Sequence, residues 1–355
     1  MQALFDPAAY AVKPLDQAAM AQCRAHWDQV AKPLNSLGQL EDVVARMAGL
    51  LGTAQVQAQG KCVLVLCADN GVVAEGVTQT DASVTAAVAL SIARGTGNIN
   101  QMARVAGAQV IPVDVGMLTE VDHPAVLNRK LRRGTGNIAQ GPAMSRQEAQ
   151  AMVQVGIDLA RQRVQAGDRL IATGEMGIGN TTTASALAAL LLDQPVEKMT
   201  GRGAGLSGAG LQRKIAAIRR AIQVNQPDPG DPLDALAKLG GFDIAAMAGV
   251  FLGGAAMGVP VVVDGFISSA AALVAQRLCP ACRQAMLASH VSREPAGAMM
   301  LQALGLTPII HAGMALGEGT GAVALMPLID MALAVYHQGS SFEGIQVAAY
   351  QPQQP

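Results

Sequence analysis

The sequence predicts an α/β protein with a mainly parallel, doubly wound sheet that is covered by helices on both faces. Short β-branched runs end in Gly, Asp or Asn, and helical stretches alternate with them along the chain. The runs are almost continuously hydrophobic, as expected for parallel strands that are buried on both faces. Alternation of such strands with helices is typical of right-handed βαβ units.

The elements follow from the spacing of apolar residues. Apolar positions recur every three or four residues in the first 50 residues, which predicts helices at 15–30 and 40–51. Strands are predicted at residues 62–67, 110–114, 170–173 and 261–264. Helices are predicted between them at 145–166, 181–192 and 211–224. The proline-rich segment 226–232 is expected to connect two helices at the surface rather than two domains.

The composition is that of a folded, apolar protein with balanced charge. Of the 355 residues, 51% are hydrophobic and 14% are charged, and the formal net charge is -1. This apolar content is far above that of disordered chains. The balanced charge argues against a nucleic-acid partner. The 39 glycines and 17 methionines suit an enzyme with glycine-rich loops or, alternatively, a glycine-rich packed core.

One apolar segment has the length of a membrane span. Residues 244–263 contain no charged side chain, and about 20 apolar residues can cross a bilayer. Glycines interrupt the segment, and Pro260 separates its first part from the run at 261–263. A buried helix followed by a buried strand is therefore the preferred interpretation. The first residues also lack the pattern of a signal peptide, so we expect a soluble, cytoplasmic protein without a membrane partner.

The five cysteines are odd in number and irregularly spaced, which argues against a disulfide framework. Cys62 and Cys67 lie in a predicted strand and are expected to point inward. Cys279 and Cys282 form a lone C-x-x-C pair, whereas a structural zinc site needs four ligands. We expect no bound metal and no cofactor, and leave the role of Cys279 and Cys282 open.

The sharpest local signal is a glycine-rich segment at 174–182, between a predicted strand and a predicted helix. Gly174, Gly177 and Gly179 precede Asn180, which opens the helix. Free backbone N–H groups and the helix dipole make such a position an anion site. The spacing matches the P-loop pattern, but Asn180 replaces the lysine that serves the outer phosphates of a nucleoside triphosphate. The segment favours a single phosphate or, alternatively, is a turn that only permits tight packing.

Other polar positions follow the predicted strands. Ligands of a doubly wound sheet bind beyond the carboxyl ends of its strands. The acidic residues expected at those ends are Asp69, Asp114, Glu175 and Asp264. Residues 201–205 match part of a dinucleotide fingerprint, but no clear strand precedes them, so NAD binding is disfavoured. A similar octet occurs at 94–101 and 133–140, which we interpret as two independent turn-to-helix junctions.

Glu318 is a candidate base because it lies between two glycines in apolar surroundings. Desolvation of a carboxylate raises its pKa and makes it a usable proton acceptor. The alternative is an acid that stabilises a helix N-terminus through the helix dipole. His290 and His311 are interpreted as satisfied histidines of the core, and no His pair has the spacing of metal ligands. The sequence contains no Ser/His/Asp arrangement with a nucleophile elbow.

In chain order, these segments closely resemble the nicotinate-nucleotide–dimethylbenzimidazole phosphoribosyltransferase family. The resemblance covers residues 60–330, and so many ordered motifs make coincidence implausible. The matching segments are residues 68–77, 134–144, 174–182, 201–203, 240–244, 263–266, 289–295 and 316–321.

The resemblance implies a fold, a reaction and a set of site residues. It implies a Rossmann-like catalytic domain at 55–330, a small helical domain from 1–54 with 331–355, and a homodimer. The reaction is transfer of ribose 5-phosphate from nicotinate mononucleotide to 5,6-dimethylbenzimidazole, in assembly of the cobalamin lower ligand. Glu318 is the implied base, and Glu175 and Lys214 are implied at the reacting sugar. The implied phosphate and ribose contacts are Gly174, Gly177, Gly179, Asn180, Thr181, Gly203, Asp264, Gly265 and Ser292.

The chemistry of that reaction fits the residues present. Nicotinate leaves as a neutral ring, so only the incoming azole must lose a proton, and one desolvated carboxylate can accept it. Positive charge on the sugar could be stabilised by Glu175 or by backbone carbonyls. Residues 78–89 lack the proline and glutamine expected near the benzimidazole, which leaves adenine, phenols and other benzimidazoles open as acceptors. A nicotinamide-dependent oxidoreductase and a non-catalytic nucleotide sensor are the competing classes.

Overall fold

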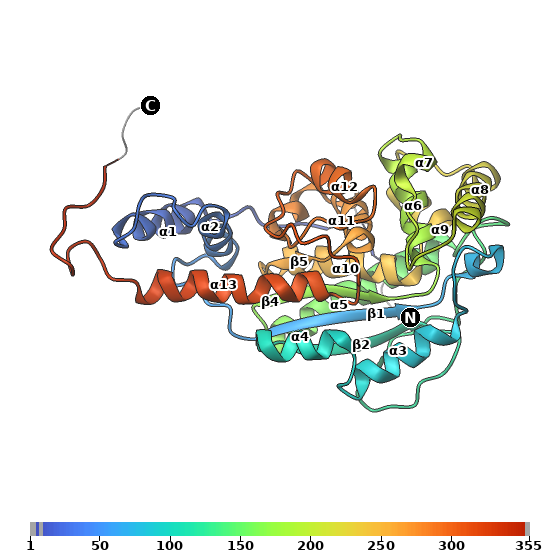
Figure 1. Ribbon diagram of the computed structural model, residues 1–355, viewed down its shortest axis with the longest axis horizontal. Coiled ribbons are helices and arrows are strands. Elements are labelled where there is room, and N and C mark those ends of the chain that lie inside the picture. Colours follow the sequence, from blue (N-terminus) through green and yellow to red (C-terminus); the bar gives the residue numbers. More distant parts are fainter. Residues whose placement is uncertain (1–4, 7–9, 352–355) are drawn as a thin grey trace.

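A computed structural model describes residues 5–6 and 10–351 and contains a six-stranded parallel sheet (Figure 1). The strands are β1 (Lys61–Ala68), β2 (Gln109–Gly116), β3 (Leu127–Asn128), β4 (Leu170–Met176), β5 (Val261–Val263) and β6 (Met286–Ala288). Their order is β3-β2-β1-β4-β5-β6, and every neighbouring pair is parallel. The predicted doubly wound α/β fold is confirmed.

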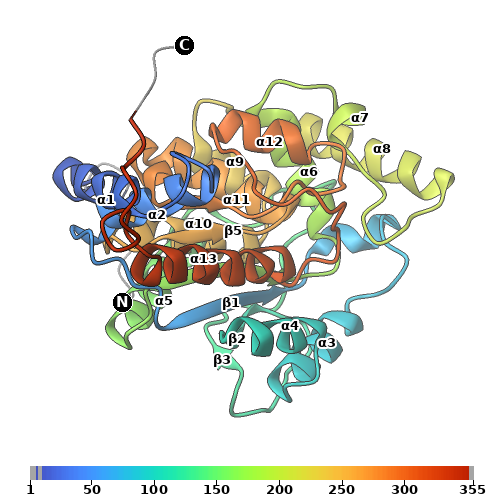
Figure 2. The same ribbon diagram turned by 60° about the vertical axis from the view of Figure 1, so that its left-hand side comes forward.

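Helices cover both faces of this sheet (Figures 1 and 2). One face carries α1 (Gln17–Gln29), α2 (Gln39–Leu51), α3 (Ser83–Ala93), α4 (Asn98–Ala106) and α13 (Thr320–Gln338). The other carries α5 (Arg146–Gln165), α6 (Asn180–Leu191), α7 (Val196–Met199), α8 (Gly208–Asn225), α9 (Pro232–Leu239), α10 (Phe242–Ala256), α11 (Phe266–Leu278) and α12 (Gly297–Leu304). Two short 3₁₀ helices are η2 (Gly71–Glu75) and η3 (Pro280–Ala285).

Strand β1 shows why its sequence is hydrophobic throughout. Leu64 and Leu66 pack in the core on the α5 and α10 side, whereas Val63 and Val65 pack in the core on the α13 side. All four are fully buried. Successive side chains of a strand point to opposite faces, so a strand at the centre of a three-layer fold needs apolar residues at every position.

Close helix packing accounts for part of the glycine content. A β-carbon on Gly156 in α5 would lie 1.9 Å from the carbonyl oxygen of Ala246 in α10, and one on Gly249 would lie 2.0 Å from that of Val153. Both glycines therefore let the two backbones touch. The abundant glycine serves a packed core as well as loops, so the two interpretations of the composition both hold.

The apolar segment at 244–263 forms all but the first two residues of α10 and then the strand β5, as expected. Helix α10 is buried almost throughout. Within the described residues, α13 is the one helix that is long and apolar enough to span a membrane. Just over half of its most apolar window, 56%, is buried against the rest of the protein. The five cysteines are free thiols, and Cys62 and Cys67 are buried as predicted.

The structure differs from the sequence-based interpretation in three places. Strands β3 and β6 were not predicted, because two or three residues are too short to show a period. Strand β4 continues to Met176, so Gly174 and Glu175 belong to the strand rather than to the loop. The octet at 94–101 does lead into α4, but the one at 133–140 lies in a loop and starts no helix. The domain division at 330/331 stays a prediction, and α13 crosses it.

Candidate active site

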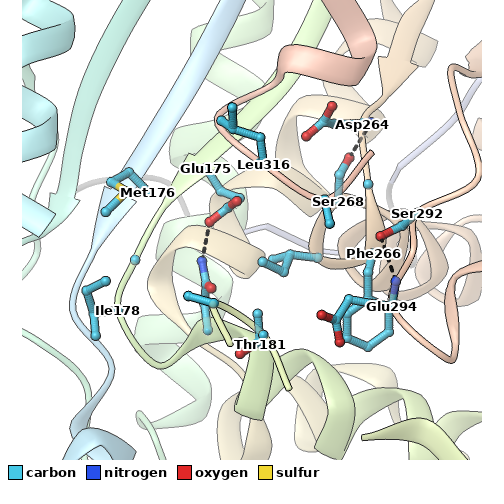
Figure 3. Close-up of a pocket in the computed structure, with 18 of the residues that line it drawn as sticks. Glu175, Met176, Ile178, Thr181, Asp264, Phe266, Ser268, Ser292, Glu294 and Leu316 are labelled. Carbon is cyan, nitrogen blue, oxygen red and sulfur yellow. Dashed lines mark hydrogen bonds between the residues drawn. The ribbon is translucent and has the colours of Figure 1, made fainter. Parts of the chain in front are cut away.

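A cavity opens at the carboxyl edge of the sheet, beyond β4 and β5 (Figure 3). The sheet order reverses between β1 and β4, and doubly wound sheets bind ligands beside such a reversal. Eight residues expected from the sequence line this cavity: Glu175, Gly177, Asn180, Thr181, Gly203, Asp264, Gly265 and Ser292. The structure therefore brings together residues from separate segments of the chain.

Four expected residues lie beside the cavity without lining it. Gly179 lines an adjoining, smaller pocket that shares the 177–181 wall. Lys214 is buried behind Thr181. Gly174 lies in β4, where a β-carbon would be 2.5 Å from the carbonyl oxygen of Glu318. Glu318 itself follows Gly317, which does line the cavity.

Two helix N-termini meet at the cavity. Gly179 is the N-cap of α6 and has φ of 95°, a left-handed conformation that glycine adopts without strain. Gly265 is the N-cap of α11, and no side chain caps either helix. The first N–H groups of a helix lack partners within it, and the dipole places positive charge there. The arrangement suits an anionic group such as a phosphate.

Lys214 adds a buried cation behind the same wall. Its Nζ donates to Thr181 Oγ1 at 2.8 Å and to the carbonyl oxygen of Gly201 at 3.2 Å. Burial lowers the pKa of Lys214 to about 8, because desolvation disfavours the ammonium form. The side chain is completely buried, so it is not the solvated basic residue that an ordinary amphipathic helix would carry.

Glu175 lies at the centre of a buried hydrogen-bonded group. Asn180 Nδ2 donates both to Glu175 Oε2 and to Asp243 Oδ2, the latter at 2.9 Å. The backbone N–H of Glu318 also donates to the Glu175 carboxylate. Burial, with the nearby charges of Asp243 and Asp264, raises the pKa of Glu175 to about 8. Near neutral pH this side chain is therefore mainly protonated.

Glu318 connects the cavity to the N-terminus of α4. Its Oε2 accepts a hydrogen bond from the backbone N–H of Ile99 at 3.4 Å. Its φ is 62°, an uncommon conformation for a residue other than glycine that costs about 1–2 kcal/mol. Burial raises the pKa of Glu318, against the lowering effect of Ile99. Glu318 is thus partly desolvated and also contacts a helix N-terminus, and its role as the base stays a prediction.

Asp264 holds the start of α13, and with it the backbone next to Glu318. Its two carboxylate oxygens accept hydrogen bonds from the N–H groups of Gly319 at 3.2 Å and Ala322 at 2.9 Å. Its own N–H donates to Ser268 Oγ at 3.1 Å, as the dashed line in Figure 3 shows. Burial raises the pKa of Asp264, and the adjacent His290 opposes that effect.

Sequence reasoning missed several residues of the site. Asp243, His290 and Glu294 occur within segments that carried the family resemblance, but no specific role was assigned to them. Asp243 is fully buried beside Asn180, and burial raises its pKa to about 6. The available signal was its position in the first turn of an apolar helix, directly after the glycine pair at 240–241. Among the described residues, no three His, Cys, Asp or Glu side chains are placed to hold a metal ion.

Comparison with known proteins places the whole chain in one family. A family profile described as "Phosphoribosyltransferase" matches residues 12–347. A nicotinate-nucleotide–dimethylbenzimidazole phosphoribosyltransferase of Ruminiclostridium cellulolyticum is 43% identical over 348 residues, which cover 98% of this chain and 99% of the relative. The protein of that name from Desulforudis audaxviator is 46% identical, over 95% of this chain and 96% of the relative.

A solved structure agrees with these relatives. The crystal structure of CobT from Thermus thermophilus superposes with a TM-score of 0.89 at 44% identity. The match covers 93% of this chain and 99% of that one. The chain therefore belongs to the nicotinate-nucleotide–dimethylbenzimidazole phosphoribosyltransferase family.

Proposed function

We propose that this protein transfers ribose 5-phosphate from nicotinate mononucleotide to 5,6-dimethylbenzimidazole, giving α-ribazole 5′-phosphate and nicotinate, in the lower-ligand branch of cobalamin biosynthesis. The observation that carries the proposal is the combination of an anion site with an adjacent pair of desolvated acids. The N-termini of α6 and α11 meet at the cavity, and Glu175 and Glu318 lie beside it.

The donor nucleotide would bind through its phosphate. In the first turn of α6, the N–H groups of Asn180 and Thr182 already donate to the carbonyl oxygens of Gly177 and Gly179, so this helix contributes mainly partial positive charge. The N–H groups at the start of α11 supply hydrogen bonds. Ser292 and the glycine loop at Gly203 lie on the same wall. Lys214 adds a positive charge behind Thr181, which favours the dianion without direct exposure to water.

The reaction needs one proton acceptor. The bond between C1′ and the pyridinium nitrogen breaks with its electron pair going to that nitrogen, so nicotinate leaves as a neutral ring. A benzimidazole nitrogen bonds to C1′ from the opposite face, which inverts the β-nucleotide to the α-product. The N–H proton of the benzimidazole passes to Glu318. Burial supports this role because it raises the pKa of Glu318 and strengthens it as a base.

Glu175 takes a different role at neutral pH. A carboxyl group with a pKa of about 8 is mainly protonated at pH 7, so it carries no negative charge to stabilise a cationic sugar. It can instead donate a hydrogen bond to the substrate through its O–H. Stabilisation of positive charge on the sugar then falls to backbone carbonyls, the other possibility that the sequence left open.

Assembly and location are part of the same proposal. Met331 and Val335 lie one turn apart on α13 and are exposed, and exposed apolar side chains on one helix face support a homodimer. The five free thiols support the reducing environment of the cytoplasm. The segment at 78–80 lines the smaller adjoining pocket rather than the main cavity.

The test is product analysis by chromatography with mass detection. Purified protein is incubated with nicotinate mononucleotide and 5,6-dimethylbenzimidazole, with Glu318→Ala in a parallel reaction. The proposal predicts α-ribazole 5′-phosphate from the wild type and nearly none from the variant. Equal product from both would keep the transferase and reject Glu318 as the base. Binding of the nucleotide without turnover of any azole would favour the sensor.

A further inference from the structure

Glu294 lines the cavity, and one oxygen of its carboxylate has no hydrogen-bond donor. The residue lines the cavity on the same wall as Ser292 and Phe266 (Figure 3). Its Oε2 is buried and has no hydrogen-bond partner within the part of the chain that the structure describes. Its backbone N–H donates to Ser292 Oγ at 3.3 Å, which fixes the loop that carries it. A buried carboxylate oxygen without a donor costs free energy in the unliganded protein.

The surrounding residues keep this carboxylate in place but do not satisfy it. A β-carbon on Gly201 would lie 1.8 Å from Glu294 Oε2 and 2.6 Å from Pro295 Cδ, so the carboxylate packs directly against Gly201. Lys214 attracts Glu294 electrostatically, but its Nζ donates to Thr181 and to the Gly201 carbonyl instead of forming an ion pair with it. Glu294 therefore lies beside the anion site with its Oε2 unsatisfied.

The donor that would complete this site can be identified by chemistry, given the proposed function. A carboxylate repels the phosphate and the carboxylate of nicotinate mononucleotide, so neither group is its partner. The uncharged hydrogen-bond donors of that nucleotide are its ribose 2′- and 3′-hydroxyls. We propose that Glu294 binds a ribose hydroxyl of the donor nucleotide and makes the enzyme selective for ribose over deoxyribose. This inference rests on the proposed function and assigns the sugar-recognition residue of that site.

Such a residue has a distinctive energetic signature. The free carboxylate is poorly solvated, so it gains more from the hydroxyl than a water-exposed group would. A substrate without that hydroxyl leaves the carboxylate buried and unpaired, which is how sites reject analogues that lack a polar group. Removing the hydroxyl and removing the carboxylate delete the same interaction. Their effects should therefore not add.

The experiment is calorimetric titration with nicotinate mononucleotide and with its 2′-deoxy and 3′-deoxy analogues. Wild type, Glu294→Gln and Glu294→Ala are compared, with Glu120→Gln as the control. Glu120 pairs with Arg133 at the surface, where both side chains are more than 60% exposed. Thermal unfolding shows whether each variant folds, and the wild-type titrations need no variant at all.

For the wild type, we expect one deoxy analogue to bind about 10- to 100-fold more weakly than the nucleotide. Glu294→Ala should weaken binding of the nucleotide by a similar factor but bind that deoxy analogue as the wild type does. Glu294→Gln should lie between them, and Glu120→Gln should match the wild type. Equal binding of all three ligands by the wild type would overturn the inference, as would fully additive effects of variant and analogue.

Failure of the proposed function gives a different result. A wild type that binds nicotinate mononucleotide with this ribose selectivity but transfers nothing would reject the reaction and keep Glu294 as a sugar ligand. A Glu294→Ala variant that binds normally and loses only kcat would overturn the inference and point to proton transfer instead. A wild type that does not bind the nucleotide would overturn both.

Discussion

Replacing Gly174 with alanine tests whether β4 positions the catalytic backbone. A β-carbon there would lie 2.5 Å from the carbonyl oxygen of Glu318 and 3.0 Å from the N–H nitrogen of Gly319. Ordinary contact begins near 3.4 Å, so the two segments must separate by about 0.9 Å. Gly174 pairs with Val65 of β1 inside the sheet. The loop that carries Glu318 should therefore move rather than the strand.

A displacement of this size has a predictable effect on rate. Misplacing a reacting group by about 1 Å can lower the rate on the order of 100-fold. We expect Gly174→Ala to lower kcat by about that factor, with little change in KM for nicotinate mononucleotide, because the phosphate site lies at other residues. Overpacking of this kind costs about 1–3 kcal/mol, so the Tm should fall by roughly 5 °C or less.

The assay is steady-state kinetics combined with thermal unfolding. Gly141→Ala is the matched control, because a β-carbon at Gly141 meets nothing within 4 Å. This control should keep wild-type kcat and Tm. A folded Gly174→Ala enzyme with wild-type kcat would refute the claim that the contact with β4 sets the position of Glu318.

Three further variants test individual groups. Glu318→Gln should lower kcat by about 10²- to 10⁴-fold, with KM for nicotinate mononucleotide nearly unchanged; a kcat close to that of the wild type would reject Glu318 as the base. Asp243→Asn removes a charge that raises the Glu175 pKa, so the loss of activity that accompanies Glu175 deprotonation near pH 8 should shift to lower pH; an unmoved pH–kcat profile would contradict the coupling. Burial holds the Lys214 pKa near 8 in the folded protein, below its ordinary 10.5, so the unfolded state binds more protons at this residue between these values and its contribution to stability becomes more favourable as the pH rises. Urea unfolding at pH values of about 7.5 and 9.5, on either side of the folded-state pKa, should show that the wild type gains stability relative to Lys214→Met as the pH rises, and an equal pH dependence of the two proteins would exclude it.

The main features of the fold were readable from local patterns. β1 and β4 are hydrophobic over most of their length, and α5 begins with a serine N-cap and a capping box. Each of these elements can therefore be predicted from its own residues. The strands β3 and β6 could not be found, because they are defined by pairing with β2 and β5 and not by their own two or three residues.

The site could be predicted from the sequence only in part, for a related reason. Glycine loops are local, so the sequence alone predicted a phosphate site at 174–182, with a turn that only permits tight packing as the alternative. The partners of the acids are distant in sequence: Glu318 accepts from Ile99, and Asn180 joins Glu175 to Asp243. No periodic pattern links such residues. Glu294 was overlooked because its significance is an unmet hydrogen bond, which only three-dimensional packing reveals.

The most direct test of the central claim follows the sugar through one reaction by NMR. The protein is mixed with nicotinate mononucleotide and 5,6-dimethylbenzimidazole, and the anomeric signals of donor and product are recorded with time. The proposed reaction predicts one nicotinate released for each ribazole phosphate formed, with the product entirely in the α configuration. Nicotinate released together with free ribose 5-phosphate, or a β-configured product, would contradict direct in-line transfer to the azole.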